Sequence, residues 1–259
     1  MHDDATSPLL NAPEIRVCIA AYNGERYIAE QIASILAQIG PDDEVVVVDD
    51  CSTDGTAAVV DQISDPRVKL FRQTRNRGYV QAFGAAMAEA RGEYILLADQ
   101  DDLWAPGRVE VMVDALRAGA DVVATNLATM GGPDYVSGPY RQVDWRLRER
   151  DSRRRLRNLF GTLIGAMSYW GCAMGLRRET LALLLPFPKY LTESHDLWIA
   201  IYGNLARSIK HLEFRSVYWR NHATNTNPKK PRGLWAVLKK RWMMARAIMS
   251  LHWRLRRLR

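Results

Sequence analysis

Three carboxylates lie within four positions, at Asp99, Asp101 and Asp102, directly after the apolar run of residues 94–98. Like charges this close repel one another unless a cation lies among them, and ligands that are all oxygen suit Mg2+ or Mn2+. Two protein carboxylates leave most positions around such a metal open, so a diphosphate is its natural further ligand. The stretch therefore predicts a site for a divalent cation and a diphosphate. The alternative is an acidic turn in which Asp102 caps the helix expected after Pro106.

Two earlier apolar runs also end in polar residues. Residues 15–21 predict a first strand that ends at Tyr22, and residues 44–48 predict a second strand that ends at Asp49 and Asp50. The second run is β-branched without alternation, as expected of a strand buried on both faces of a parallel sheet. Ligands of such sheets bind where the carboxyl ends of the strands meet. We therefore expect these polar residues and the three carboxylates to converge on one edge of the sheet.

Helical segments separate the predicted strands. Apolar residues recur at helical spacing over residues 26–39, and further helices are expected over residues 56–63 and 79–90, with a short strand at residues 67–71. This alternation predicts the α/β fold class, with a doubly wound sheet and right-handed crossovers. The first strand is not followed by a GxGxxG loop, which disfavours a dinucleotide-dependent oxidoreductase.

Length and composition set the broad class of protein. At 259 residues the chain can form one large α/β domain with a sizeable core. No apolar run reaches the roughly 18 residues that a membrane span needs, and the acidic first 14 residues do not resemble a signal peptide. The cysteines Cys18, Cys51 and Cys172 form no CxxC pair, which indicates reduced thiols and no zinc site. We therefore expect a cytoplasmic protein that is not integral to the membrane.

The net charge of +7 is concentrated in two segments. Residues 229–259 hold eleven Lys/Arg and no Asp/Glu, so the rest of the chain carries 25 basic against 29 acidic residues. The second segment, residues 141–157, holds eight Arg against three acids. Both favour an anionic surface as a partner. The second segment is a lid, an acceptor platform or a lipid contact, and the sequence does not decide between these.

Tryptophans and other apolar residues interleave with the cations of residues 229–259. This pattern predicts a C-terminal basic amphipathic helical tail that lies among anionic lipid headgroups, with Trp235 and Trp242 at the boundary. The alternative is a helix packed on the body with its cations solvated. Nucleic acid is not expected as a partner, because the aromatic residues favour one apolar face instead of lining a basic groove.

Four short segments, in order, resemble the family 2 glycosyltransferases with the GT-A fold. The matching segments are residues 20–23, 47–56, 76–78 and 97–104. The later half is similar to bacterial rhamnosyltransferase-like members at residues 171–174, 195–200 and 218–222, so the likeness runs from about Ile15 to Asn227. The resemblance implies a doubly wound mixed sheet flanked by helices in a domain over residues 1–228, with a donor half at about 14–104 and an acceptor half at about 105–228. The basic tail over residues 229–259 would follow it.

The resemblance also implies roles for individual residues. It would place Tyr22 against the nucleobase of a nucleotide-sugar donor and have Asp50 accept from the N3–H of a pyrimidine. Asp101 would bind the Mn2+ or Mg2+ that bridges the two phosphates of the donor, and His222 is a second candidate ligand. The remaining donor contacts implied are Ala20, Arg77, Asp99 and Gln100.

The resemblance makes Asp196 the candidate general base, since an inverting transfer needs a carboxylate on the acceptor side to take the hydroxyl proton and the family has one at this position. Glu193, three residues earlier, is the competing carboxylate, and Asp196 is alternatively a helix N-cap ahead of the apolar run of residues 197–202. Cys172 is expected in the wall behind the sugar. Trp104 and Trp170 either stack on sugar rings or belong to the core.

The resemblance implies an inverting, metal-dependent glycosyltransferase at the inner face of the cell membrane. It would add one sugar, such as L-rhamnose from a dTDP-sugar, to a lipid-linked cell-surface glycan. The alternatives are a transferase of the same fold that uses a UDP-hexose or UDP-N-acetylhexosamine, and a non-catalytic module that binds the membrane surface. Residues 238–242 are similar to the QxxRW motif of processive synthases but lack its glutamine, so single-sugar addition is favoured.

Overall fold

An eight-stranded mixed sheet forms the centre of the molecule, with strand order β3-β2-β1-β4-β7-β6-β8-β5. The structure is a computed structural model and describes residues 14–139, 141–221 and 233–257. The strands are β1 (Ile15–Ala21), β2 (Glu44–Asp49), β3 (Val68–Arg72), β4 (Tyr94–Asp99), β5 (Leu103–Trp104), β6 (Val122–Thr129), β7 (Met174–Arg177) and β8 (Ile209–Trp219).

Strands β1 to β4 pair in parallel, as the continuous apolar runs predict. Strand β7 is antiparallel to both β4 and β6, whereas β6 and β8 are parallel and β5 is antiparallel to β8. All four valines of residues 45–48 are buried, which requires cover on both faces of the sheet. The predicted α/β class with a mixed sheet is confirmed.

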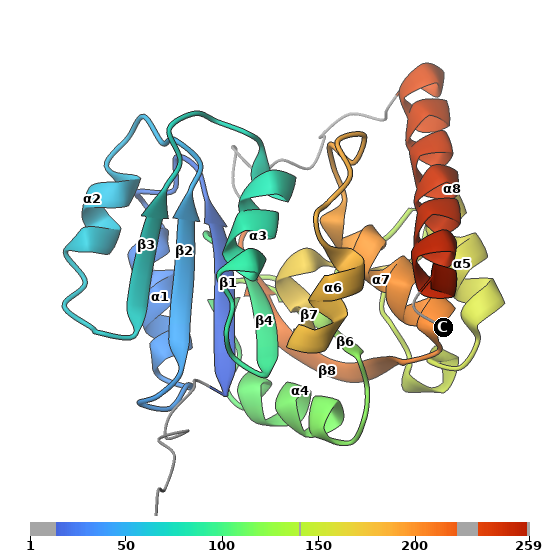
Figure 1. Cartoon of the computed structure of the whole chain (residues 1–259). Coiled ribbons are helices and arrows are strands. Elements are labelled where there is room, and N and C mark those ends of the chain that lie inside the picture. Colours follow the sequence, from blue (N-terminus) through green and yellow to red (C-terminus); the bar gives the residue numbers. More distant parts are fainter. Residues whose placement is uncertain (1–13, 140, 222–232, 258–259) are drawn as a thin grey trace, which may run out of the picture.

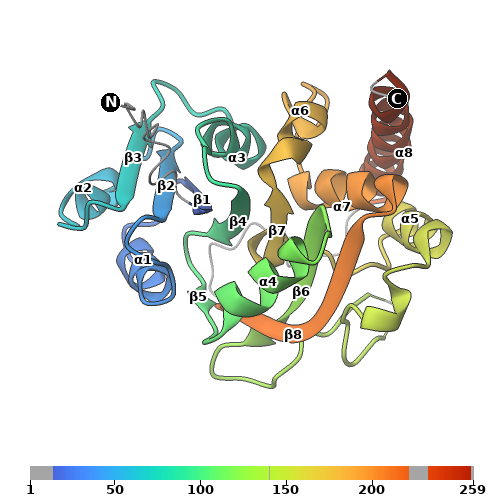
Figure 2. The same cartoon turned by 60° about the horizontal axis from the view of Figure 1, so that its bottom comes forward.

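Helices cover both faces of the sheet (Figures 1 and 2). They are α1 (Ile28–Leu36), α2 (Thr56–Asp61), α3 (Tyr79–Ala88), α4 (Arg108–Arg117), α5 (Arg155–Ile164), α6 (Leu181–Leu184), α7 (His195–Ala206) and α8 (Leu234–Arg257). Helices α1, α2 and α4 pack with one set of sheet residues, and α3, α5, α6, α7 and α8 pack with the other. The alternation of side chains along each strand therefore supplies two separate apolar cores.

The predicted elements of the first hundred residues lie within a few residues of those observed. The first helix begins at Ile28 instead of residue 26, because the backbone N–H groups of Tyr27 and Ile28 both donate to the carbonyl oxygen of Gly24. A tight turn therefore precedes the helix. The next two helices end at Asp61 and Ala88, two residues before the predicted ends.

Helix α8, which forms most of the predicted basic tail, packs on the body of the protein. Its buried residues Met243, Met244, Ala247 and Leu251 join the core beneath α7. Of the helices in the described part of the chain it is the longest, and none of them combines the length and hydropathy needed to span a membrane. The predicted helix is present, and its contact with lipid stays a prediction.

Candidate active site

The polar residues that follow β1, β2 and β4 lie at one edge of the sheet. The parallel register pairs Ala20 with Asp99 and Ala21 with Asp49, so these three strands end side by side (Figure 1). Tyr22, Asp50 and the acidic residues after β4 therefore leave the sheet next to one another. The structure brings together the residues that the sequence analysis expected to converge.

Gln100 links the loop after β4 to the loop after β1. The N–H of Tyr22 donates to its Oε1 at 2.8 Å, and its Nε2 donates to the carbonyl oxygen of Tyr22 at 3.0 Å. A Cβ at Gly24 would lie only 2.3 Å from Oε1, so any other residue there would displace the Gln100 amide from these contacts. Gln100, expected to contact the donor, thus uses its amide to hold the backbone of Tyr22. The Tyr22 ring is left exposed.

Asp50 is almost fully buried and holds the loop that precedes α3. Its Oδ1 accepts from the N–H of Arg77 at 2.8 Å, and its Oδ2 accepts from the N–H of Gly78 at 2.7 Å. Each oxygen of an ionised carboxylate has a second lone pair. The predicted contact with a pyrimidine N3–H is thus compatible with the loop contacts, and it stays a prediction. The Arg77 side chain is exposed.

A group of potential metal ligands lies where β4 ends. Asp99, Asp102 and Cys172 each offer a ligand atom, and these atoms lie within 4.8 Å of one another. Cys172 comes from the 3-10 turn Gly171–Ala173, which leads into β7 beside β4. Asp101, the predicted metal ligand, lies outside this group, although its charge acts on both aspartates. The sequence analysis counted Asp102 among the carboxylates around the expected cation but named Asp101 as the ligand, and it predicted no ligand role for Cys172.

The electrostatics of this group favour a bound cation. Burial and, after it, the charge of Asp101 raise the pKa of Asp102 to about 7. Burial, followed by the charges of Asp102, Asp101 and Asp196, also raises the pKa of Asp99 well above its usual value. The Oδ2 of Asp102 is buried and accepts no hydrogen bond from a nitrogen or oxygen of the described residues. A divalent cation would relieve this repulsion, so the residues present fit one.

The fully buried Arg108 lies behind the ligand group. Its guanidinium donates to the carbonyl oxygens of Leu97 and Cys172, at 3.0 and 2.7 Å, and to the Oγ of Ser216 at 2.7 Å. Burial lowers the pKa of Arg108 to about 10, although the nearby Asp102 opposes this shift. The sequence analysis did not identify this residue, because an arginine in an amphipathic helix is expected to be exposed to solvent. It ties β4, the Cys172 turn and β8 together.

We expect Arg108→Met to lower the free energy of unfolding by about 3–5 kcal/mol. The substitution leaves the buried carbonyl oxygens without their donor and the nearby carboxylates without a compensating positive charge. Arg117, at the other end of α4, pairs with Glu14 and is half exposed, so Arg117→Met is the matched control and should leave the free energy of unfolding nearly unchanged. Urea unfolding of both variants measures the difference. Equal small losses would contradict the structural role of Arg108.

The end of β8 is attached to the acidic loop through Arg220. The N–H of Arg220 donates to the Oδ1 of Asp102 at 3.0 Å, and its Nε donates to the carbonyl oxygen of Asp101 at 3.0 Å. The idea that Asp102 caps the next helix is wrong, because α4 begins at Arg108 with no side-chain cap. His222, the second candidate metal ligand, lies outside the described residues, two positions beyond Arg220.

Asp196 lies in the first turn of α7, close enough to Asp99 for its charge to raise the pKa of that residue. The N-cap position belongs to Ser194, so the N-cap alternative for Asp196 is wrong, although its Oδ1 accepts from the N–H of Leu197 at 2.8 Å. Burial raises the pKa of Asp196 to about 6. A carboxyl that titrates near neutrality suits proton transfer. Its competitor Glu193 pairs instead with Lys240 of α8 at 3.7 Å.

Two aromatic neighbours of the site belong to the core. Trp104 is only 4% exposed and lies beneath the Arg108 guanidinium, so it is a core residue and does not stack on a sugar. His195 stacks on Phe83 with ring centroids 4.2 Å apart, and burial lowers the pKa of His195 to about 3. A neutral imidazole packed in this way supports the first turn of α7 and is unsuited to act as a base. Trp170 makes an edge contact with Trp145.

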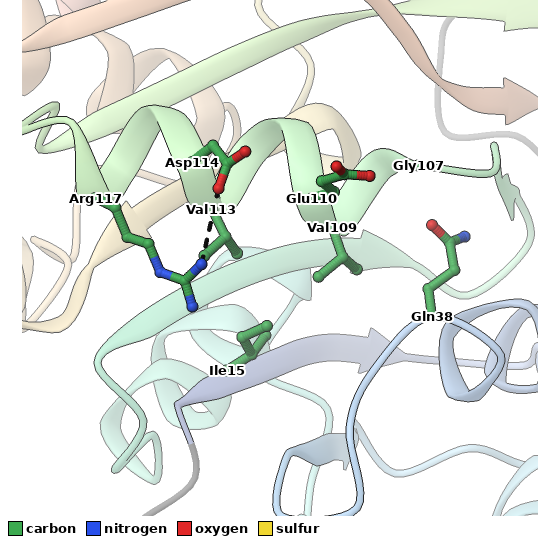
Figure 3. Close-up of a pocket in the computed structure, with 8 residues that line it drawn as sticks. All are labelled: Ile15, Gln38, Gly107, Val109, Glu110, Val113, Asp114 and Arg117. Carbon is green, nitrogen blue, oxygen red and sulfur yellow. Dashed lines mark ion pairs between the residues drawn. The ribbon is translucent and has the colours of Figure 1, made fainter.

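A separate pocket of about 440 Å³ lies between α4 and the start of β1 (Figure 3). Its polar lining includes Gln38, Glu110, Asp114 and Arg117, and Figure 3 shows the ion pair between the last two. None of the predicted site residues that the structure describes lines it. The acidic edge of the sheet is therefore the better candidate for chemistry.

Comparison with known proteins gives one family match and several relatives. A sequence profile described as "Glycosyl transferase family 2" matches residues 16–184. The succinoglycan biosynthesis protein ExoO of Rhizobium meliloti (strain 1021) is 46% identical over 116 residues, 44% of this chain and 33% of that protein. The protein named UDP-Glc:alpha-D-GlcNAc-diphosphoundecaprenol beta-1,3-glucosyltransferase WfgD, of Escherichia coli, is 31% identical over 102 residues, 39% of this chain and 40% of that protein. The aligned parts thus span less than half of these relatives.

Among solved structures, the crystal structure of S. aureus TarS 1-349 in complex with UDP-GlcNAc is similar. The TM-score is 0.66 at 22% identity, and the likeness covers 91% of this chain and 66% of that chain. At this level of identity the likeness shows the fold. The arrangement of strands and helices described above is therefore shared with that protein.

Proposed function

The chain belongs to glycosyl transferase family 2, and we propose that it is an inverting enzyme that moves one sugar from a nucleotide sugar to a glycan hydroxyl. The proposal rests on one observation: the carboxylates that follow β4 and the carboxylate of Asp196 lie close together at one edge of the sheet. Asp196 of α7 faces the acidic loop after β4 closely enough to shift the pKa of Asp99. The carboxylates after β4 suit the binding of a cation with a diphosphate, and Asp196 suits the removal of a proton from an attacking hydroxyl.

On the donor side, we propose that the exposed ring of Tyr22 stacks on the base and that Asp50 accepts from a pyrimidine N3–H. The name of WfgD specifies UDP-Glc, and the TarS crystal holds UDP-GlcNAc, so both use a uracil nucleotide. Thymine and uracil share the N3–H. The proposed donor is a dTDP-deoxyhexose such as dTDP-L-rhamnose, and a UDP-hexose or UDP-N-acetylhexosamine is the alternative.

Asp99 and Asp102, with Asp101 and the Cys172 sulfur adjoining, would hold a divalent metal, and His222 remains a proposed further ligand. The carboxylates suit Mg2+ or Mn2+, and a nearby sulfur favours the softer Mn2+. When bound, the metal would supply positive charge against the leaving diphosphate. The exposed Arg77 side chain would add a cation from the loop that Asp50 holds.

On the acceptor side, a carboxylate oxygen of Asp196 would take the proton of the attacking hydroxyl. As the new bond to the anomeric carbon forms on one face of the sugar, the bond to the diphosphate oxygen breaks on the other, which inverts the configuration. The donor half would thus be residues 14–104 and the acceptor half residues 105–228. The buried Arg108 would hold the end of β4 through the Leu97 carbonyl oxygen, and the partly exposed Arg220 would hold the acidic loop through Asp102 and the Asp101 carbonyl oxygen.

The proposed acceptor is a lipid-linked glycan of a cell-surface polysaccharide. The ExoO name refers to succinoglycan biosynthesis, and the WfgD name includes a diphosphoundecaprenol acceptor. Lipid-linked acceptors of this kind are held at a membrane. We therefore propose that the protein is cytoplasmic and peripheral at the inner face of the membrane, with residues 229–259 as its basic tail.

A panel of dTDP-, UDP- and GDP-sugars, incubated with Mn2+, tests the proposed function. We expect slow hydrolysis of one thymine or uracil nucleotide sugar and binding of the matching nucleoside diphosphate that requires the metal. Calorimetry and a coupled diphosphate assay measure the two. Neither turnover nor metal-dependent nucleotide binding across the panel would leave only the non-catalytic membrane-surface module.

The pH dependence of turnover should follow Asp196. Because burial raises its pKa to about 6, the carboxylate is ionised and able to accept a proton above that pH, and it is protonated below. We expect kcat at saturating donor and Mn2+ to be about tenfold lower at pH 5 than at pH 7. The acidic limb should vanish in Asp196→Asn, whose residual rate has no titrating base. An unchanged acidic limb in that variant would assign the titration to another group.

A further inference from the structure

Exposed large apolar side chains gather on α5 and α8. Of the thirteen such residues in the part of the chain that the structure describes, eight lie on these two helices. They are Leu156, Phe160, Leu234, Trp235, Leu238, Trp242, Met249 and Trp253, and their exposed fractions run from 49% to 84%. A concentration of this kind marks an interaction surface.

The apolar residues of α8 form one stripe along its outer face. Trp235, Leu238, Trp242, Met249 and Trp253 follow one another at intervals of three, four, seven and four positions, which is the spacing of one helical face. The opposite face is buried against α7, and Arg254 donates to the carbonyl oxygens of Leu183 and Leu184. These contacts fix the rotation of the helix, so the stripe points steadily outward.

Helix α5 adds to the same surface. Leu156 and Phe160 are one turn apart and lie opposite Asn158, Gly161 and Thr162, which are buried. The two helices are in contact, and Figures 1 and 2 both show them side by side at the end of the molecule farthest from α2. The exposed apolar groups of both helices therefore belong to one end of the protein.

The charge of both helices has one sign. Neither contains Asp or Glu, α5 has Arg155 and Arg157, and the described part of α8 carries seven Lys/Arg. The Arg246 guanidinium lies 5.5 Å from the ring centroid of Trp242, and that of Arg257 lies 3.4 Å from the ring of Trp253. Tryptophan and arginine together suit the headgroup layer of a membrane. There the indole rings are buried among the lipids and the guanidiniums contact lipid phosphates.

Basic residues continue beyond the amino end of α5. A groove of about 810 Å³ begins there, and its cations are Arg150, Arg153, Arg155, Arg207 and Lys210. Among the described residues that line it, Glu149 alone is acidic, and it pairs with Lys210. The guanidinium group of arginine can donate two parallel hydrogen bonds to the oxygens of a phosphate. The part of residues 141–157 that lines the groove thus adds further positive charge at the start of α5.

We propose that α5 and α8 together form a docking surface for an anionic lipid bilayer. A second copy of the chain fits the surface poorly, because face-to-face contact would bring nine cations of one copy against nine of the other. The proposal deepens the proposed function, since it would bring the acceptor half to the membrane that holds a lipid-linked glycan. It adds α5 to the basic tail as a second lipid contact.

Cosedimentation of the full-length protein with vesicles, without any sugar donor, tests the surface. Wild type should bind vesicles of phosphatidylglycerol and phosphatidylethanolamine and should bind pure phosphatidylcholine at least about tenfold more weakly. The α5 pair Leu156→Ser and Phe160→Ser should lower the apparent affinity by about tenfold or more, and so should the α8 pair Trp242→Ser and Trp253→Ser. Phe71→Ser, on the distant strand β3 and 40% exposed, is the matched control and should bind as wild type.

If the α5 double variant binds vesicles as tightly as wild type, α5 is not part of the docking surface and α8 alone contacts the lipid. Equal binding to anionic and neutral vesicles would overturn the choice of lipid. A wild-type dimer in sedimentation velocity runs that both pairs abolish, without vesicle binding, would identify a second copy as the occupant. Thermal melting of each variant checks the fold, and hydrogen exchange over residues 156–164 of the wild type, with and without vesicles, tests α5 without any substitution. Because no step uses a donor, failure here is separate from failure of sugar transfer.

Discussion

Asp196→Asn is expected to lower kcat by about 10³-fold while the dissociation constant of the nucleotide-sugar donor stays within about twofold of wild type. The amide keeps the shape of the side chain and its acceptor oxygen for the Leu197 N–H, but it takes no proton at neutral pH. Steady-state transfer to an acceptor gives kcat, and calorimetry with Mn2+ gives donor binding. The substitution also removes a partly buried charge, so it should not lower the free energy of unfolding.

Glu193→Gln is the matched control for this experiment. Glu193 lies three positions earlier and pairs with Lys240, so its loss should change kcat by less than about threefold. A loss of kcat in Glu193→Gln as large as that in Asp196→Asn would move the base to Glu193. Loss of donor binding in Asp196→Asn would contradict the acceptor-side assignment.

Asp101→Ala is expected to abolish measurable turnover and metal-dependent nucleotide binding, with the fold intact. Asp102→Asn should act in the same direction, because it removes one charge from the ligand group while its amide oxygen still accepts from the Arg220 N–H. A lost metal contact is worth several kcal/mol, so turnover of Asp102→Asn should fall by about 10³-fold. Titration of nucleoside diphosphate binding against Mn2+ measures the effect in both variants.

Asp114→Asn provides the control for these carboxylates. Asp114 is exposed on α4 in the separate pocket of Figure 3, so its variant should require the same Mn2+ concentration as wild type. If Asp102→Asn needs more Mn2+ and Asp101→Ala does not, the metal belongs to Asp99 and Asp102, and the sequence-based choice of Asp101 is wrong. If neither variant changes the Mn2+ requirement, the acidic edge is not the metal site.

The donor half could be predicted from the sequence because its signals are local. Apolar runs mark β1, β2 and β4, and the polar residues at their ends must meet because parallel strands share an edge. Tyr22, Asp50 and Asp99 are brought together in this way. The family resemblance added Asp196, whose approach to Asp99 no local pattern predicts.

The acceptor side could not be derived in the same way. Cys172 reaches Asp99 and Asp102 only because β7 runs antiparallel between β4 and β6, and nothing in the spacing of the residues signals that insertion. Arg108 has no sequence signal either, since its burial depends on carbonyl acceptors contributed by Leu97 and Cys172. The exposed stripe of α8 was visible in the sequence, but which of its two apolar faces packs on the protein was not.

Helix α8 contributes its inner face to the same core that supports α7, and α7 carries Asp196 in its first turn. Deleting residues 234–259 would expose the core residues that contact Met243, Met244, Ala247 and Leu251. It would also remove Lys240, the ion-pair partner of Glu193. A shortened protein that no longer sediments with vesicles would therefore not distinguish a lost anchor from a damaged catalytic half. Point substitutions on the outward stripe are the variants that separate attachment from catalysis.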